Sequence, residues 1–288
     1  MTVSGMRTPG ALEGLRARGG TGRRRRGFGV VRLFWWLVFI VGAIYFFVPL
    51  IGTLAFSLRD VPITAAYTGI LEDQEFASTL LYSFVVGLAT VVVSTALVVP
   101  TAFWVRLKLP RARPFVEFIT LLPFMIPPVV LVFGLISTYS QPPLALMESS
   151  TGANALLVAA YVVLSLPYMY RAADAGLAAI DVRTLTEAGQ ILGAGWPTIL
   201  MRIILPNVRV AVLSGAFLTL AIVIGEFTIA SFLGRPAFAP YLGLLGSADP
   251  FRQAAVALVS FGLTWVAMII ISIVGRGSQS RVSVGGAH

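Results

Sequence analysis

The sequence predicts an all-α membrane protein, a bundle of six transmembrane helices with a cytoplasmic helical loop and both termini in the cytoplasm. Of its 288 residues, 57% are hydrophobic and only 11% are charged, whereas a soluble domain carries about 25% charged residues. Six apolar stretches are long enough to cross the hydrocarbon core, which takes about 20 residues. Alternation with period two is absent from them, so a transmembrane β-barrel is disfavoured.

The six predicted spans divide the chain into four parts. Their approximate limits are 34–58, 78–105, 115–139, 154–170, 210–233 and 254–274. The first is far longer than the roughly 7–15 apolar residues of a signal peptide, so we expect it to be retained. The resulting parts are a basic arm (1–33), the first span with its outer loop (34–77), a core (78–275) and a tail (276–288).

Loop charges predict the direction of the spans. All of the 21 Lys and Arg residues except Arg59, Arg235 and Arg252 fall on one side of the predicted bundle. The positive-inside rule makes that side the cytoplasm. The arm (1–33) lacks apolar periodicity and is expected to be disordered. Its arginines precede a membrane span, so they indicate contact with the lipid bilayer rather than with nucleic acid.

The composition excludes several kinds of chemistry. There is no cysteine, and the only histidine is His288, the last residue. Thiol chemistry, a Ser–His–Asp triad and the usual zinc sites are therefore excluded or disfavoured. The only lysine, Lys108, does not lie in a G-x-x-x-x-G-K-[ST] loop. We expect a chain that is not an enzyme, holds no metal or cofactor, and has no ATP site of its own.

The loop at 171–209 contains helix signals. Asp181 is a favourable N-cap for a helix that begins near Val182. Apolar residues at helical spacing predict one apolar face for this helix, made of Leu185, Ala188 and Leu192. An isolated helix of this length is marginal in water, so we expect it to pack in a groove of a soluble partner.

Glycine and proline mark the end of this helix and the start of a second one. Gly193 predicts a left-handed helix stop. Pro197 fits the first position of the second helix, where its missing N–H costs nothing. Pro206 is expected to end or kink that helix just before the fifth span. The loop is thus predicted to be helix, turn and helix on the cytoplasmic face.

A motif of fixed spacing runs through this loop: Glu187-Ala188-Gly189, then Gly193, then Ile203-Ile204-Leu205-Pro206. It resembles the EAA motif, E-A-A-x3-G-x9-I-x-L-P, of the membrane subunits of bacterial binding-protein-dependent ABC importers. Gly189 in place of the second alanine is the one departure, and it is expected to soften the helix by about 0.8–1.0 kcal/mol. The resemblance covers about residues 78–275, including Leu122-Pro123, Pro127-Pro128 and Gly225-Glu226-Phe227.

The resemblance implies a permease subunit of the bacterial cytoplasmic membrane that forms half of a translocation pathway. In this family the loop is a coupling helix that sits in a cleft of a separate ATPase, which binds ATP and Mg. It places coupling at Glu187, Ala188, Gly189, Gly193, Leu205 and Pro206. Glu187 would make polar contacts with the ATPase, and Leu205-Pro206 would relay motion into the fifth span. The other implied partners are a second permease, expected to be a different chain, and an extracytoplasmic solute-binding protein.

The resemblance is closest to permeases for spermidine and putrescine, so a polyamine is the expected cargo. Relatives that carry ferric iron, aminoethylphosphonate, thiamine, sulfate or sugars share the same features. In this family the binding protein largely sets the cargo, and the permease sequence discriminates poorly between these solutes.

Three residues inside the predicted spans are candidates for the translocation pathway: Glu226, Pro127 and Pro128. A carboxylate in a span costs about 2.5–3.5 kcal/mol unless it has a partner, a proton or a water-filled cavity. Glu226 therefore either lines the pathway, or caps a helix break or pairs with an arginine of the bundle. A second class, an ion-coupled secondary transporter or channel with Glu226 as the titrating group, explains this acid but not the cytoplasmic loop. An intramembrane enzyme would need paired carboxylates, and Glu117 is expected near the opposite face.

Overall fold

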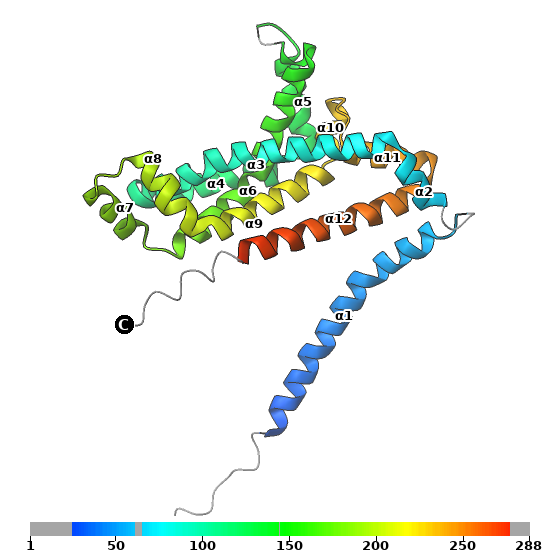
Figure 1. The fold of residues 1–288 in the computed structure, drawn as a ribbon, viewed down its shortest axis with the longest axis horizontal. Helices are drawn as coiled ribbons and strands as arrows, with labels where there is room; N and C mark the ends of the chain where they lie inside the picture. Colours follow the sequence, from blue (N-terminus) through cyan, green and yellow to red (C-terminus); the bar gives the residue numbers. More distant parts are fainter. Residues whose placement is uncertain (1–24, 61–64, 144, 277–288) are drawn as a thin grey trace, which may run out of the picture. The chain divides into compact units, whose positions relative to one another are not determined.

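The computed structural model describes residues 25–60, 65–143 and 145–276, and this part of the chain contains helices and no strand (Figure 1). The helices are α1 (Arg25–Ser57), α2 (Ala65–Glu72), α3 (Gln74–Lys108), α4 (Arg113–Met125), α5 (Pro128–Tyr139), α6 (Ser150–Ala178), α7 (Val182–Ile191), α8 (Trp196–Thr198), α9 (Leu205–Gly225), α10 (Thr228–Phe232), α11 (Phe238–Ala248) and α12 (Pro250–Arg276). A π-helical turn, Ile199–Ile204, joins α8 to α9. The predicted all-helical class is confirmed.

Four helical segments of the described chain are long and apolar enough to cross a membrane: Arg32–Ser57, Gln74–Lys108, Ser150–Ala178 and Trp196–Gly225. A fifth span results if the bent pair α4–α5 counts as one. The predicted sixth span, 254–274, lies within α12, but α12 is not among these segments. Six spans and cytoplasmic termini therefore remain predictions. Most of the basic arm and of the tail, 1–24 and 277–288, lies outside the described residues.

The chain divides into two units. The first ends at Gly52 and consists, in its described part, of most of α1, a single apolar helix with Pro49 inside it. The second unit begins at Thr53 and contains all the other helices. The features that follow all belong to the second unit.

Helices α3, α6 and α9 lie side by side and form the centre of the second unit (Figure 1). Glycine permits the closest approach between α6 and α9. A Cβ on Gly176 would lie 2.6 Å from the Cβ of Ala211, and one on Gly215 would lie 2.9 Å from the Cβ of Ala172. Small residues are the usual means of close helix packing in lipid, where van der Waals contact replaces the hydrophobic effect between helices.

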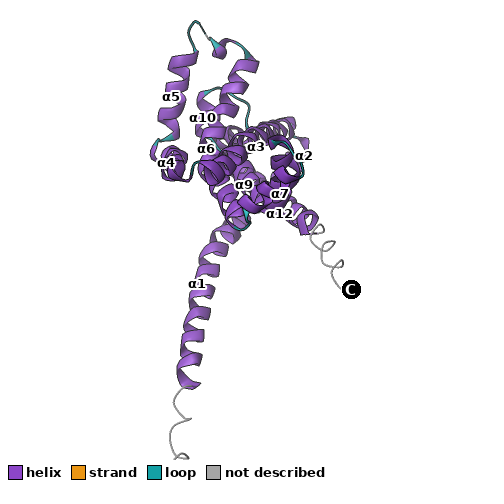
Figure 2. Ribbon diagram, turned by 90° about the vertical axis from the view of Figure 1, so that its left-hand side faces the viewer, coloured by secondary structure: helices purple, strands orange, loops and turns teal. Residues whose placement is uncertain are grey.

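The third predicted span, 115–139, is broken rather than straight. Helices α4 and α5 are bent by 95° at their junction, and Figure 2 shows α5 turning away from α4. Ile126 is extended (φ −97°, ψ 115°), and α5 begins at Pro128 directly after Pro127. Neither proline has a backbone N–H, and a residue before proline is driven out of the helical region, so the helix must stop here.

The predicted ends of the fourth and fifth spans are wrong. Helix α6 continues to Ala178 instead of ending near Tyr170, so Arg171 belongs to a helix and not to the loop. The fifth span was predicted to end at Leu233. Its helix ends at Gly225, and the separate short helix α10 follows. The first error comes from treating charge as a helix end, although a helix can continue into water when its charges are paired.

The carboxylate on the last turns of α6, Asp174, is paired with arginines from two other helices. Asp174 accepts hydrogen bonds from Arg106 of α3 at 2.9 Å and from Arg113 of α4 at 2.8 Å. Arg113 also binds Glu117, one turn along α4, at 2.8 Å. The side chain of Asp174 is only 16% exposed. One carboxylate therefore joins α3, α4 and α6 at the end of the bundle that the charge rule makes cytoplasmic.

A second polar cluster joins elements at the opposite end of α3. Asp73 caps α3 and accepts hydrogen bonds from Tyr241 of α11 at 2.6 Å and from Arg252 of α12 at 2.8 Å. Burial raises the pKa of the Asp73 carboxyl, but the bonds from Tyr241 and from the backbone N–H groups of Glu75 and Phe76 outweigh it, so the pKa is lowered. The bonds to the ionised Asp73 carboxylate therefore stabilise the folded protein fully above the unfolded pKa of about 3.9. This stabilisation is lost as the pH falls through the folded pKa.

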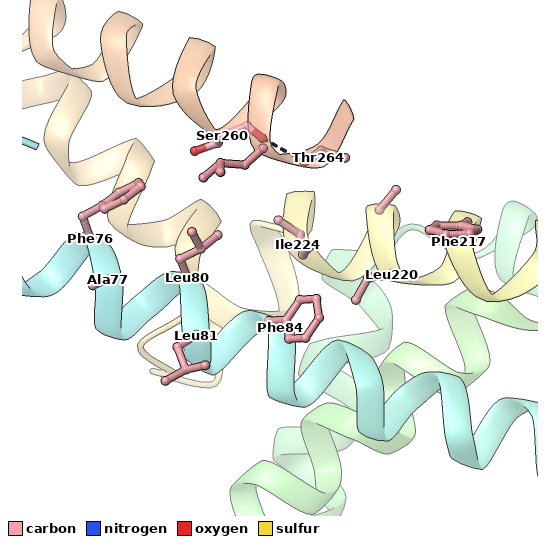
Figure 3. A pocket seen from close by; sticks show the side chains of 12 residues that line it. Phe76, Ala77, Leu80, Leu81, Phe84, Phe217, Leu220, Ile224, Ser260 and Thr264 are labelled. Atoms are coloured by element: carbon pink, nitrogen blue, oxygen red, sulfur yellow. Dashed lines mark hydrogen bonds between the residues drawn. The ribbon is translucent and has the colours of Figure 1, made fainter. Parts of the chain in front are cut away.

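An apolar pocket of about 430 Å³ lies between α3, α9 and α12 (Figure 3). The only side-chain hydroxyls in its lining, on Ser260 and Thr264, donate to carbonyls of their own helix, at 2.7 and 2.8 Å. The pocket offers no free polar side-chain group, which makes it unsuitable for a small hydrophilic solute.

We expect Asp174→Ala to destabilise the protein by about 2–3 kcal/mol, because it leaves two arginines without their shared carboxylate. The expected loss is smaller than for a fully buried pair, since Arg113 is half exposed and partly screened by water. Thermal unfolding in detergent measures it. Glu148→Ala is the control, because this exposed carboxylate has no ion pair in the described structure. Equal midpoints for the two variants would contradict the prediction.

Candidate functional site

Helix α7 begins where the sequence predicts. Asp181 is its N-cap, and the carboxylate accepts a hydrogen bond from the backbone N–H of Thr184 at 3.1 Å and from its hydroxyl at 2.8 Å. These two bonds lower the pKa of the Asp181 carboxyl. The cap is therefore fully ionised at neutral pH, where it satisfies an N–H group that would otherwise lack a partner.

The turn after α7 has the geometry of a Schellman motif. Gly193 has φ +77°, in the left-handed region that glycine adopts without strain. Its N–H donates to the carbonyl of Gln190, and the N–H of Ala194 donates to the carbonyl of Gly189, at 2.9 and 3.0 Å. This pair of bonds defines the motif. The predicted turn at Gly193 is confirmed, and Pro197 lies at the second position of α8 rather than the first.

The predicted apolar face of α7 is not the one that packs against the protein. The residues of α7 that are buried are Val182, Thr186 and Gly189. Ala188 and Leu192, from the predicted face, are exposed, and Leu185 is half-buried. Ile191 and Leu192 have exposed fractions of 85% and 86%. The helix thus presents apolar side chains to the outside, at the end of the bundle that also carries α8 (Figure 1).

Gly189 has a packing reason that the sequence did not reveal. A Cβ at this position would lie 2.9 Å from the Cδ1 of Ile203 and 3.1 Å from the Cγ1 of Ile199. Both isoleucines belong to the π-helical turn before α9. Glycine in place of the second alanine was expected only to soften the helix. Because it has no Cβ, it also lets α7 lie close to this turn.

The π-helical turn explains how the chain passes Pro206. Leu205 donates its N–H to the carbonyl of Leu200, five residues earlier, instead of four. Proline lacks an N–H and crowds the carbonyl four residues before it, and a wider turn relieves both problems. Pro206 was expected to end or kink the helix. It does not end it, because Trp196–Gly225 is a continuous helical segment.

Glu187 lies on the exposed side of α7 and is paired within its own helix. It accepts a hydrogen bond from Arg183 at 2.8 Å, and the two side chains are 57% and 82% exposed. Exposed pairs of this spacing contribute little to stability. The carboxylate is therefore accessible and can exchange its partner for one on another protein.

Glu226 connects α9 to α10. It is extended (φ −79°, ψ 115°), and its carboxylate accepts hydrogen bonds from the backbone N–H of Ile229 at 2.9 Å and of Ala230 at 3.3 Å. The hydroxyl of Tyr161 on α6 donates to it at 3.2 Å. Of the roles expected for Glu226, capping of a helix break is the one for which the structure shows hydrogen bonds. The described residues provide no arginine partner for this carboxylate.

The structure brings the two breaks together through the short helices that follow them. Helix α5, which follows Pro127 and Pro128, packs on α10, which follows Glu226. The rings of Phe133 and Phe232 lie 5.0 Å apart across this contact. The three pathway candidates thus lie at the starts of two packed elements, whereas α7 and α8, with the coupling loop, lie at one end of the bundle (Figure 1).

Comparison with known families places the chain among membrane transport components. Residues 98–284 match the model of the family described as binding-protein-dependent transport system inner membrane component. The chain belongs to this family. It is therefore a permease subunit of a binding-protein-dependent ABC transport system.

Three relatives illustrate the similarity. A probable ABC transporter permease protein of Sinorhizobium fredii is 30% identical over 68% of this chain, which spans about a third (34%) of that longer relative. A probable molybdenum ABC transporter permease protein of Haloferax volcanii is 27% identical, over 81% of this chain and 86% of the relative. The molybdenum transport system permease protein ModB of Azotobacter vinelandii is 28% identical, over 47% of this chain and 62% of the relative. A similarity to polyamine permeases is not shown by these proteins.

Sequence reasoning missed two contributors to these permease sites. Tyr161 binds Glu226 from a helix 65 positions away, and nothing in its surroundings singles it out from other tyrosines. Ile191 is the second exposed apolar residue of α7. The signal for Ile191 was available, since it and Leu192 are two adjacent apolar residues just before a helix-stop glycine on a polar loop.

We expect Glu226→Ala to destabilise the protein by about 1–3 kcal/mol, because it leaves backbone N–H groups of α10 without an acceptor. Glu226→Gln keeps a carbonyl oxygen in place and should stay within about 1 kcal/mol of the wild type. Thermal unfolding in detergent compares the two variants. If both lose the same stability, the capping bonds are not what Glu226 contributes.

Proposed function

We propose that this chain forms half of the translocation pathway of an ATP-driven importer and that α7 is the element through which a separate ATPase drives it. The observation that carries the proposal is the exposed surface of α7. Ile191 and Leu192 have exposed fractions of 85% and 86% at the end of a short, capped helix. Apolar side chains of this size stay exposed on a polar loop chiefly where another protein covers them.

The proposed contact is a helix lying in a groove of the ATPase. Ile191 and Leu192 would be its apolar anchors and Glu187 its polar contact. The opposite side of α7, at Gly189, is in tight contact with the π-helical turn. A displacement of α7 would therefore press directly on Ile199 and Ile203, because packed interiors are nearly incompressible.

The proposed relay runs from this turn into the membrane. Leu205 and Pro206 continue the helical segment that ends at Gly225, so a rigid displacement at the cytoplasmic end reaches Glu226. There the chain breaks and α10 packs against α5, beyond Pro127 and Pro128. We propose that these two breaks form the moving part of the pathway, with the ATPase supplying ATP and Mg at the other end.

The other partners follow from the family. A second permease would complete the pathway, and we propose that it is a different chain. An extracytoplasmic binding protein would deliver the cargo. The ion-coupled secondary transporter is not proposed, since the family assignment favours the ATP-driven class and Glu226 is already engaged in capping α10.

We propose molybdenum, carried as the tetrahedral oxyanion molybdate, as the cargo in place of a polyamine. The support is that two of the relatives have molybdenum in their names, one of them similar over 81% of this chain. The proposal concerns the whole importer, because the binding protein selects the solute.

We expect Leu192→Asp to abolish co-purification of the ATPase with the tagged permease, because a charge in an apolar contact is strongly unfavourable. The measurement is mass spectrometry of the complex purified in mild detergent. Met201→Asp is the control, as Met201 is also apolar and exposed, at 62%, but lies outside α7. If both variants retain the ATPase, α7 is not the docking element.

We expect Glu187→Ala to lower transport-coupled ATP hydrolysis by roughly tenfold, as for a charged residue at the centre of an interface. Its unfolding midpoint should hardly change, because the pair with Arg183 is exposed. ATPase activity of the reconstituted complex, with and without binding protein, measures this. Wild-type rates of hydrolysis and transport would mean that Glu187 has no role in coupling.

We expect deletion of the gene to abolish high-affinity uptake of labelled molybdate and to leave uptake of labelled putrescine unchanged. Complementation with the intact gene is the control. The reverse result, loss of putrescine uptake alone, would restore the polyamine expectation and overturn the molybdenum proposal.

A further inference from the structure

A polar pocket of about 340 Å³ opens between α4 and α6, at the end of the bundle that the charge rule makes cytoplasmic. Its lining consists of Glu117, Thr120, Leu121, Tyr170, Arg171, Asp174 and Ala175. The pocket contains neither Pro127 nor Glu226, and neither the coupling loop nor the family assignment gives it a role.

Two donor side chains in this lining, Tyr170 and Arg171, have no partner among the described residues. Tyr170 is only 2% exposed, and its hydroxyl has no hydrogen-bond partner in the described structure. Buried polar groups are normally paired, so an unpaired hydroxyl beside a cavity calls for an explanation. Arg171 is exposed and makes neither an ion pair nor a side-chain hydrogen bond with any described residue.

Each of the two carboxylates around the pocket already accepts a hydrogen bond from an arginine. Asp174 accepts from Arg106 with one oxygen and from Arg113 with the other. Glu117 accepts from Arg113, and the Thr120 hydroxyl donates to a backbone carbonyl. The two carboxylates are thus matched by two arginines, and the charge of Arg171 is left over. The cluster has free donors and one surplus positive charge, which suits an anion and disfavours a cation.

We propose that this pocket binds a tetrahedral oxyanion group through the guanidinium of Arg171 and the hydroxyl of Tyr170. Guanidinium and hydroxyl groups are the usual donors to phosphate-like oxygens, and the bond from arginine is charge-assisted. Tyr170 would gain the acceptor that it lacks. The adjoining arginines, Arg106 and Arg113, would hold Glu117 and Asp174 neutralised so that they do not repel the ligand.

Two sources of such a group reach this place. One is the phosphate of an anionic phospholipid, whose acyl chains could lie against the exposed rings of Phe115 and Phe118 on α4. The other is a free oxyanion at the cytoplasmic mouth of the protein. The binding chemistry is the same for both, and it does not depend on the docking of α7 or on the cargo proposed above.

The test uses the full-length protein, purified without added lipid, and three probes. Sodium molybdate and inorganic phosphate are titrated by calorimetry, and retained phosphatidylglycerol is measured by native mass spectrometry, with phosphatidylcholine as the neutral comparison. We expect Arg171→Gln to weaken binding at least tenfold and Tyr170→Phe to weaken it several-fold. Arg111→Gln is the matched control, since it removes an exposed arginine from the neighbouring connection and should bind as the wild type does.

Each outcome decides the proposal. Binding of the free oxyanions that is lost in Arg171→Gln supports a solute site, and selective retention of phosphatidylglycerol that is lost in the same variant supports a lipid site. Wild-type protein that binds none of the three probes overturns the proposal. So does binding that the Arg171 and Tyr170 variants keep, provided that their unfolding midpoints match the wild type.

Discussion

The structure depends on the requirement that every backbone N–H and C=O group at membrane depth finds a partner inside the protein. Helices meet it within a single segment, which is why the regular secondary structure of the described residues is helical. Any break must then be repaired locally. At Pro127 and Pro128 the missing donors remove part of the problem, and at Glu226 a carboxylate accepts the N–H groups that start α10. The repair at Glu226 uses an acidic side chain because a single carboxylate can accept several N–H bonds.

The same requirement shapes the junction between the cytoplasmic loop and the membrane. Pro206 would interrupt a regular α-helix, but the π-helical turn at Ile199–Ile204 widens the spiral and lets it continue. This turn is also the surface on which Gly189 packs. A proline that looks like a helix end in the sequence is therefore part of a continuous helical segment that runs from Trp196 to the break at Glu226.

The sequence predicts the class of fold and the course of the loop well, because both depend on local signals. Asp181, Gly193 and the spacing of Glu187 to Pro206 act within a few residues, and the structure places the cap and the turn there. It fails where the deciding partner is distant in the chain. The pairing of Asp174 with Arg106 extends α6 past its predicted end, and the contact with Ile203 decides which face of α7 is buried. No periodicity within α7 contains that information.

The outward face of α7 and the polar cluster at Asp174 together divide the cytoplasmic end into two kinds of surface. Around Ile191 the surface is apolar and the single charged pair is exposed, so a protein groove can cover it at little electrostatic cost. Around Arg171 the donors outnumber the free acceptors, and a protein surface that covered them would have to supply an anion. An ATPase that docks on the first surface would therefore leave the second accessible to lipid or solute, and the two can be altered independently.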